Sequence, residues 1–112
     1  YIWNFEDTDI YFGTNNIARL YIRKQTGHLE PAADNAQNLG SSSKRWANIY
    51  TGDLQLSNVT SSVDQNGESQ EAVGNDVDGT QGTWTIQEGA NDLFIINRVN
   101  GKKYKFNLTE VT

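Results

Sequence analysis

The stretch TWTIQEGANDLFIINRVNGKKYKFNLTE, residues 83–110, decides the fold of this chain. At its start Trp84 and Ile86 alternate with threonine and glutamine, the period of two that is typical of a strand with one covered face. The small and polar residues at 88–92 then predict a turn. This order of alternation, turn and apolar run predicts two antiparallel strands.

A second turn is indicated by Asn100-Gly101, because this dipeptide is the strongest short-range signal for a β-hairpin. With a two-residue turn there, Ile95 would lie opposite Phe106. One face would collect five apolar side chains, namely Leu93, Ile95, Tyr104, Phe106 and Leu108. Residues 83–111 are therefore predicted to form a three-stranded β-meander.

The N-terminal half carries further short strands with turn residues between them. The predicted strands cover residues 1–5, 9–12, 17–23 and 53–56. A turn is predicted at Gly13-Thr14-Asn15-Asn16, since glycine and asparagine tolerate a positive φ. In the last strand Leu54 and Leu56 would face inward. The predicted fold class is all-β.

Residues 60–82 differ from the rest of the chain in composition. They contain five acidic residues and four glycines, with no basic and no aromatic residue. Such a segment buries too little apolar surface to offset its ordering entropy, so it predicts an exposed loop or linker. The predicted organisation is a β module at 1–58, an acidic Gly-rich loop at 59–82 and the meander at 83–112.

The composition leaves little material for a hydrophobic core. Ile, Leu, Val and Phe make up 25 of the 112 residues, only just above the ~20% below which charged chains are disordered. Small domains with so little core often bury surface against another copy, which predicts an oligomer.

The net charge of −5 argues against nucleic acid as a partner, and no apolar run is long enough to insert into a membrane. The chain has no cysteine. It begins with Tyr1 and not with methionine, which suggests that it is part of a longer protein.

The segment LGSSSKRWANIY, residues 39–50, predicts a tight turn followed by about one helical turn near 42–50. Serine hydroxyls are good N-cap acceptors, and Trp46 and Tyr50 are spaced to share one helical face with Ile49 beside them. A helix this short cannot hold itself together, so its aromatic residues must dock on a larger surface.

Three parts of the sequence resemble the distal region of bacteriophage tail fibre proteins. They are the Gly-Thr-Asn block at 13–22, the block at 34–50 with its Leu-Gly-Ser and Arg-Trp-x-x-Ile-Tyr motifs, and the C-terminal blocks at 83–89 and 100–106. In many relatives the Ile-Tyr motif is followed by the start of a self-cleaving intramolecular chaperone. Thr51 to Ser57 has no such sequence, so self-processing is not expected of this segment.

The resemblance implies a structural virion protein that forms an intertwined or side-by-side parallel homotrimer and attaches the phage to its host. Its partners would be two further copies of itself, other tail or baseplate proteins, and a glycan or protein receptor on the host surface. The side chains expected to pack in the trimer are Trp3, Leu20, Ile22, Trp46, Ile49, Tyr50, Trp84 and Phe106. The candidate receptor contacts lie in the acidic loop and are Asp64, Glu68, Asp76 and Asp78.

Other readings of the same residues are weaker. The acidic loop has the oxygen ligands and glycines of calcium loops, but it does not complete their twelve-residue pattern, and a glycosidase needs two rigidly held carboxylates. His28, the only histidine, has no second ligand or nucleophile near it in sequence. The chain is therefore expected to be no enzyme and to need no metal or cofactor. The alternatives left open are a fragment of a tailspike polysaccharide depolymerase, and a virion decoration or fibre-attachment module without receptor contact.

Overall fold

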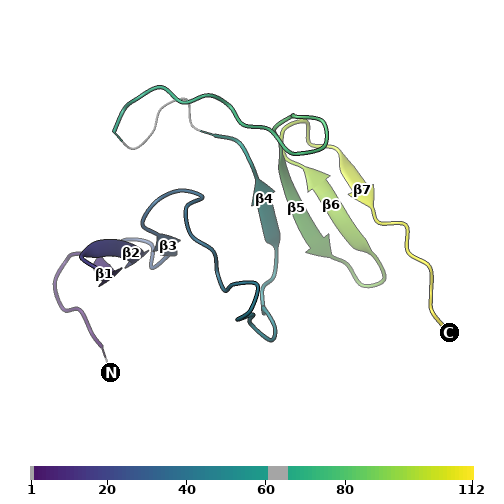
Figure 1. Cartoon of the computed structure of the whole chain (residues 1–112). Helices are drawn as coiled ribbons and strands as arrows, with labels where there is room; N and C mark the ends of the chain where they lie inside the picture. The colour runs from purple at the N-terminus through teal and green to yellow at the C-terminus, as the bar shows by residue number, and fades with distance from the viewer. Residues whose placement is uncertain (1, 61–65) are drawn as a thin grey trace. The chain divides into compact units, whose positions relative to one another are not determined.

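The computed structural model describes residues 2–60 and 66–112, and in this part of the chain it contains two antiparallel sheets and no helix. The all-β prediction is confirmed. The contacts divide the chain into two compact units, Tyr1–Asn48 and Ile49–Thr112, each built around one sheet (Figure 1). The described residues contain no helix with the length and apolarity that a membrane span requires.

The first unit holds a three-stranded sheet in the order β1-β2-β3. Its strands are β1 (Ile10–Thr14), β2 (Ile17–Ile22) and β3 (Leu29–Pro31). Asn15 and Asn16 connect β1 to β2 with φ values of 52° and 58°. A positive φ at both positions is the signature of a type I′ turn, whose twist matches that of the flanking strands. The strands predicted at 9–12 and 17–23 are confirmed as β1 and β2. The turn is shorter than predicted, because Gly13 and Thr14 belong to β1 and only Asn15 and Asn16 form the loop.

The segment before β1 is not a strand, so the strand predicted at 1–5 is wrong within its described residues, 2–5. Asn4 instead closes a local turn, since its Nδ2 donates to the Thr8 carbonyl at 2.9 Å and its Oδ1 accepts from the Glu6 N–H at 3.0 Å. Alternation alone cannot hold a strand that has no neighbour in the sheet.

The segment around residues 39–50 forms bends and one tight turn. The Ser41 N–H donates to the Lys44 carbonyl at 2.9 Å, and the Lys44 N–H donates to Ser41 Oγ at 3.0 Å. Trp46 and Tyr50 are exposed. The helical turn near 42–50 is not formed in the single chain, where nothing covers its aromatic side chains, and its formation on docking stays a prediction.

The second unit holds a four-stranded sheet in the order β4-β5-β6-β7. Its strands are β4 (Leu54–Ser57), β5 (Thr83–Glu88), β6 (Leu93–Asn97) and β7 (Lys103–Lys105). The last three are the predicted meander. β4, which the predicted organisation groups with the first module, pairs with β5.

The predicted register between the last two strands is wrong by two residues. Ile95 lies opposite Tyr104 and not opposite Phe106. The cause is Asn97, whose Oδ1 accepts from the Val99 N–H at 2.9 Å and from the Asn100 N–H at 3.3 Å. This side-chain turn makes the loop four residues long, and only Gly101 within it has a positive φ, 76°.

The core of the described chain is small. Ile96 of β6, 7% exposed, is its one buried hydrophobic residue, and Thr85 of β5 is its one fully buried side chain. These two residues lie directly opposite each other across the β5–β6 ladder. The most buried part of the second unit is therefore the face of the sheet that carries this pair.

Candidate functional site

The opposite face of the second sheet is apolar, and within the described residues no other element of the second unit covers it. We call it the apolar face, and it comprises Leu54, Leu56, Trp84, Ile86, Leu93, Ile95, Tyr104 and Phe106. The register places Leu56 beside Trp84 and Ile95 beside Tyr104, and the rings of Trp84 and Tyr104 lie 5.9 Å apart. Leu54, Leu56 and Tyr104 are each 46% exposed. An apolar patch of this kind is typical of an interaction surface.

The face that carries Thr85 is closed by the chain's own polar side chains. Arg98 Nε donates to Thr85 Oγ1 at 2.9 Å, and the Thr85 hydroxyl donates to Gln55 Oε1 at 2.6 Å. Two residues further along β5 and on the same face, Gln87 Nε2 donates to Asp53 Oδ2 at 3.0 Å. The buried hydroxyl of Thr85 on this face is therefore satisfied within the chain.

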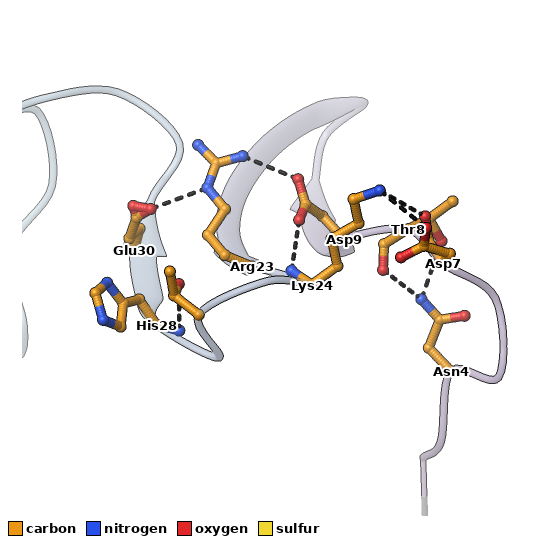
Figure 2. A network of polar contacts seen from close by, with 9 residues as sticks. Asn4, Asp7, Thr8, Asp9, Arg23, Lys24, His28 and Glu30 are labelled. Carbon is orange, nitrogen blue, oxygen red and sulfur yellow. Dashed lines mark hydrogen bonds and ion pairs between the residues drawn. The ribbon is translucent and has the colours of Figure 1, made fainter.

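A polar network ties together the first unit (Figure 2). Arg23 lies at its centre, with Nη1 3.0 Å from Asp9 Oδ2 and Nε 2.9 Å from Glu30 Oε1. Its guanidinium also lies 4.6 Å from the centre of the Tyr21 ring, and the Lys24 N–H donates to Asp9 Oδ1 at 2.7 Å. These contacts join the segment before β1 to β2 and β3, which gives the network a structural role.

The network lowers the pKa of Asp9 below its ordinary value of 3.8, mainly through the Lys24 N–H and then through the Arg23 guanidinium. A lowered pKa in the folded state means that the carboxylate stabilises the unit above pH 3.8, and that this stability is lost as the pH falls through the lowered pKa. We expect the first unit to lose stability in this acidic range. Thermal unfolding between about pH 5 and about pH 2, followed on the NMR signals of Arg23 and Lys24, measures it.

Asp9→Asn is the matched variant for this pH dependence, because asparagine can still accept the Lys24 N–H but cannot carry the charge. It is expected to flatten the acidic loss of stability. An unchanged pH profile in Asp9→Asn would contradict the role assigned to this carboxylate.

The loop before β5 is held by its own side chains. Asn75 Oδ1 accepts from the N–H groups of Val77 and Asp78 at 2.8 and 2.9 Å. Asn75 Nδ2 donates to Asp78 Oδ1 at 2.7 Å, and the same oxygen accepts from the Thr80 N–H and hydroxyl. The Asn75 amide and Thr80 together hold the pKa of Asp78 below its ordinary value.

The same loop is anchored to the end of β4. Asn58 Nδ2 donates to the Thr80 carbonyl at 3.2 Å, and Asn58 Oδ1 accepts from the Gly82 N–H at 2.8 Å. Gln81 Nε2 donates to the Asn58 carbonyl at 3.0 Å. Between loop and sheet lies a cleft of about 380 Å³, which we call the loop cleft; Leu56, Ser57, Asn58, Asn75, Thr80, Gln81, Gly82 and Trp84 line it.

The predicted packing residues fall in several places. Leu20 and Ile22 share one face of the first sheet, and Trp84 and Phe106 lie on the apolar face of the second. The remaining four, Trp3, Trp46, Ile49 and Tyr50, are exposed and lie outside the strands. These two pairs of residues lie on sheet faces, and their packing in a trimer stays a prediction.

The structure describes three of the four acidic residues predicted to contact a receptor. Asp64 lies outside the described residues, Glu68 and Asp76 are exposed, and Asp78 is engaged in the loop. Among the residues that the structure describes, no group of three or more His, Cys, Asp or Glu side chains could hold a metal ion. His28 donates its N–H to Thr26 Oγ1 at 3.2 Å.

The loop cleft was missed by reasoning from sequence. Its walls come from the segments 56–58 and 75–84, which meet through the β4–β5 ladder and through the hydrogen bonds of Asn58 to Thr80 and Gly82. The wall formed by the loop did have a local signal in the sequence, since an asparagine three residues before Asp78-Gly79 is typical of a turn closed by a side chain.

No protein-family model, curated protein or solved structure matches the chain.

Proposed function

We propose that this chain is a structural segment of the distal part of a bacteriophage tail fibre, assembled as a homotrimer and used in attachment to the host surface. The observation that carries the proposal is the apolar face of the second sheet. The phage assignment itself rests on the sequence resemblance described above.

The described part of the chain has little core of its own. One buried apolar side chain in the described residues is too little for a stable domain of this size. Covering Leu56, Trp84, Ile95 and their neighbours with the same face of another copy would supply the missing burial. The charged side chains that the register places on this face, Glu88 and Lys102, lie at its ends, so copies can approach its centre without burying a charge.

A trimer also accounts for attachment by weak contacts. Three copies of one surface, held on a rigid β-scaffold, bind a dense receptor with an avidity well above the affinity of a single copy. Loops carried by the sheets, including the loop at 75–82, would make the contacts. The partners on this proposal are further copies of the chain, other tail proteins and a host receptor.

Light scattering after size exclusion tests the proposal. We expect a mass three times the 12.5 kDa of the chain, stable on dilution into the low micromolar range. A chain that stays monomeric at every concentration and melts cooperatively would overturn the fibre proposal. Loss of viscosity when the protein is added to host surface polysaccharide would instead favour the depolymerase alternative.

Binding tests then separate attachment from decoration. A trimer that adheres to host cells is the expected result. A trimer that binds phage particles but no host cells would support the decoration or fibre-attachment module.

A further inference from the structure

We propose that a groove over β6 and β7, on the face of the second sheet opposite the apolar face, binds one sugar ring that carries an anionic group. The groove, which we call the basic groove, has a volume of about 360 Å³ and is lined by Gln87, Phe94, Ile96, Lys103, Tyr104 and Lys105. This inference rests on the proposed function, because it names the class of receptor that the segment would contact. It adds a contact on the sheet itself to those proposed for the loops.

The register separates the basic groove from the surface that the proposed trimer buries. Phe94 lies opposite Lys105, and Ile96 lies opposite Lys103, across the β6–β7 ladder. Because successive side chains of a strand point to opposite faces, these four side chains share one face. Tyr104 lies between the two lysines, so its ring belongs to the apolar face and its backbone lines the groove. The side chains that would hold a ligand therefore stay accessible when copies associate through the apolar face.

The face that carries the groove is covered by polar side chains only over β4 and β5. There Gln55 and Arg98 form hydrogen bonds with Thr85. On the β7 side Lys103 and Lys105 are exposed, and within the described residues no other strand of the second unit packs over them. The groove is thus open at the outer edge of the sheet (Figure 1).

The charge around the groove favours an anion. Residues 93–109 contain four of the nine basic residues of the chain and no acidic residue. Lys103 and Lys105 start about 7 Å apart along one strand, and in the part of the chain that the structure describes neither forms an ion pair. Charges more than about 8 Å away are largely screened at physiological salt. The two lysines, and not the net charge of −5, therefore set the local field.

The aromatic ring in the groove favours a sugar over a bare anion. Phe94 is half-buried, and a Cβ at position 89 would lie 2.6 Å from its Cε2, so Gly89 gives the ring room to lie against the turn before β6. Beside it the Gln87 amide is held by its hydrogen bond to Asp53. A pyranose has C–H groups on its faces that match an aromatic ring, and hydroxyls at its edge that match an amide. An aromatic side chain beside a few fixed polar groups in a volume of this size is typical of small-ligand sites.

NMR titration of the unmodified chain tests the site directly. The probes are trigalacturonic acid, which carries carboxylates, and a glucose phosphate, with neutral maltotriose and inorganic phosphate for comparison. We expect one or both anionic sugars to shift the ring signals of Phe94 and the side-chain signals of Lys103 and Lys105, with a millimolar dissociation constant. Binding should weaken several-fold when the salt concentration is raised from about 0.02 M to about 0.2 M.

The comparison probes separate the sugar ring from its charge. Maltotriose and inorganic phosphate should each bind about tenfold more weakly than the better anionic sugar, because each lacks half of the matching chemistry. Which anionic sugar binds identifies the anionic group as a carboxylate or a phosphate. Equal binding of maltotriose, equal binding of inorganic phosphate, or the absence of shifts at Phe94 and the two lysines would overturn the proposal.

Matched charge variants test the two lysines. Lys103→Gln combined with Lys105→Gln removes two positive charges from the groove, and we expect it to weaken binding of the anionic sugar by about tenfold or more. Lys44→Gln combined with Arg45→Gln removes two positive charges from exposed positions in the first unit and should bind as the unmodified chain does. An equal loss in both double variants would contradict the proposal, because the net charge alone would then decide binding.

A neutral variant tests the ring. Phe94→Leu keeps every charge but removes the aromatic face, and we expect it to weaken binding of the anionic sugar by about threefold or more. Its weak binding of inorganic phosphate should stay unchanged, which shows that the lysines are still in place. Unchanged sugar binding in Phe94→Leu would contradict the role assigned to the ring.

The mass of each sample separates this inference from the proposed function. A trimer is expected to bind one anionic sugar per chain, because the groove lies off the apolar face. A trimer whose groove signals respond to neither anionic sugar overturns the saccharide site and leaves the fibre proposal standing. A monomer that binds the probe in the groove overturns the fibre proposal and leaves the saccharide site standing.

Discussion

Ile95→Lys is expected to convert the assembled protein into single chains of 12.5 kDa. Ile95 lies in the middle of the apolar face, between Ile86 of β5 and Tyr104 of β7. In a trimer closed over this face, three ammonium groups would be buried without partners, which is strongly unfavourable. We expect the concentration at half-dissociation to rise by about 100-fold or more, measured by light scattering or sedimentation over a dilution series.

Val99→Lys is the matched control for this change. Val99 is also β-branched, is 75% exposed and lies in the loop between β6 and β7, off the apolar face. The same charge at this position should leave the mass unchanged. If Ile95→Lys also kept the mass of the unmodified assembly, the apolar face could not be the surface through which copies associate.

Ile96→Ala is expected to destabilise the second unit by about 3 kcal/mol. Ile96 is the one buried hydrophobic residue of the described chain, so the cavity left by alanine has few neighbours that could relax into it. A loss of this size is a large fraction of the total stability of a small domain. Denaturant unfolding at matched protein concentrations measures it.

The control for the core change is Val99→Ala, which removes apolar atoms from an exposed position. We expect it to alter the free energy of unfolding by less than about 0.5 kcal/mol. Similar losses from Ile96→Ala and Val99→Ala would mean that the pair Ile96 and Thr85 is not the centre of the second unit.

Much of the fold follows from local patterns in the sequence. The hairpin at Asn15-Asn16 and the strands around Trp84 and Ile95 were predictable because turn chemistry and alternation agree there. The register error at Asn97 has a different origin. Two turn signals, Asn97 and Asn100-Gly101, lie within five residues. The turn that forms is the one in which the Asn97 side chain accepts a hydrogen bond from the Val99 N–H.

The candidate sites were harder to predict because they depend on distant contacts. The acidic residues of the loop look equivalent in composition, yet Asp78 is used to hold the loop while Asp76 is exposed. The loop cleft needs Asn58 and Gly82 to meet across more than twenty residues, and no periodicity reports such a contact. The helical turn predicted near 42–50 would depend on a surface that a single chain does not supply.

The residues of the loop at 75–80 contribute unequally to the hydrogen bonds that hold it. Asn75, Asp78 and Thr80 make the hydrogen bonds that fix its shape, whereas Val77 contributes only its backbone N–H and is 95% exposed. Almost any side chain can therefore replace valine at position 77 without altering the loop. A lineage of such proteins can change the chemistry displayed at this position by single mutations while its scaffold stays the same. On the proposed function, such changes are a route to a new host surface.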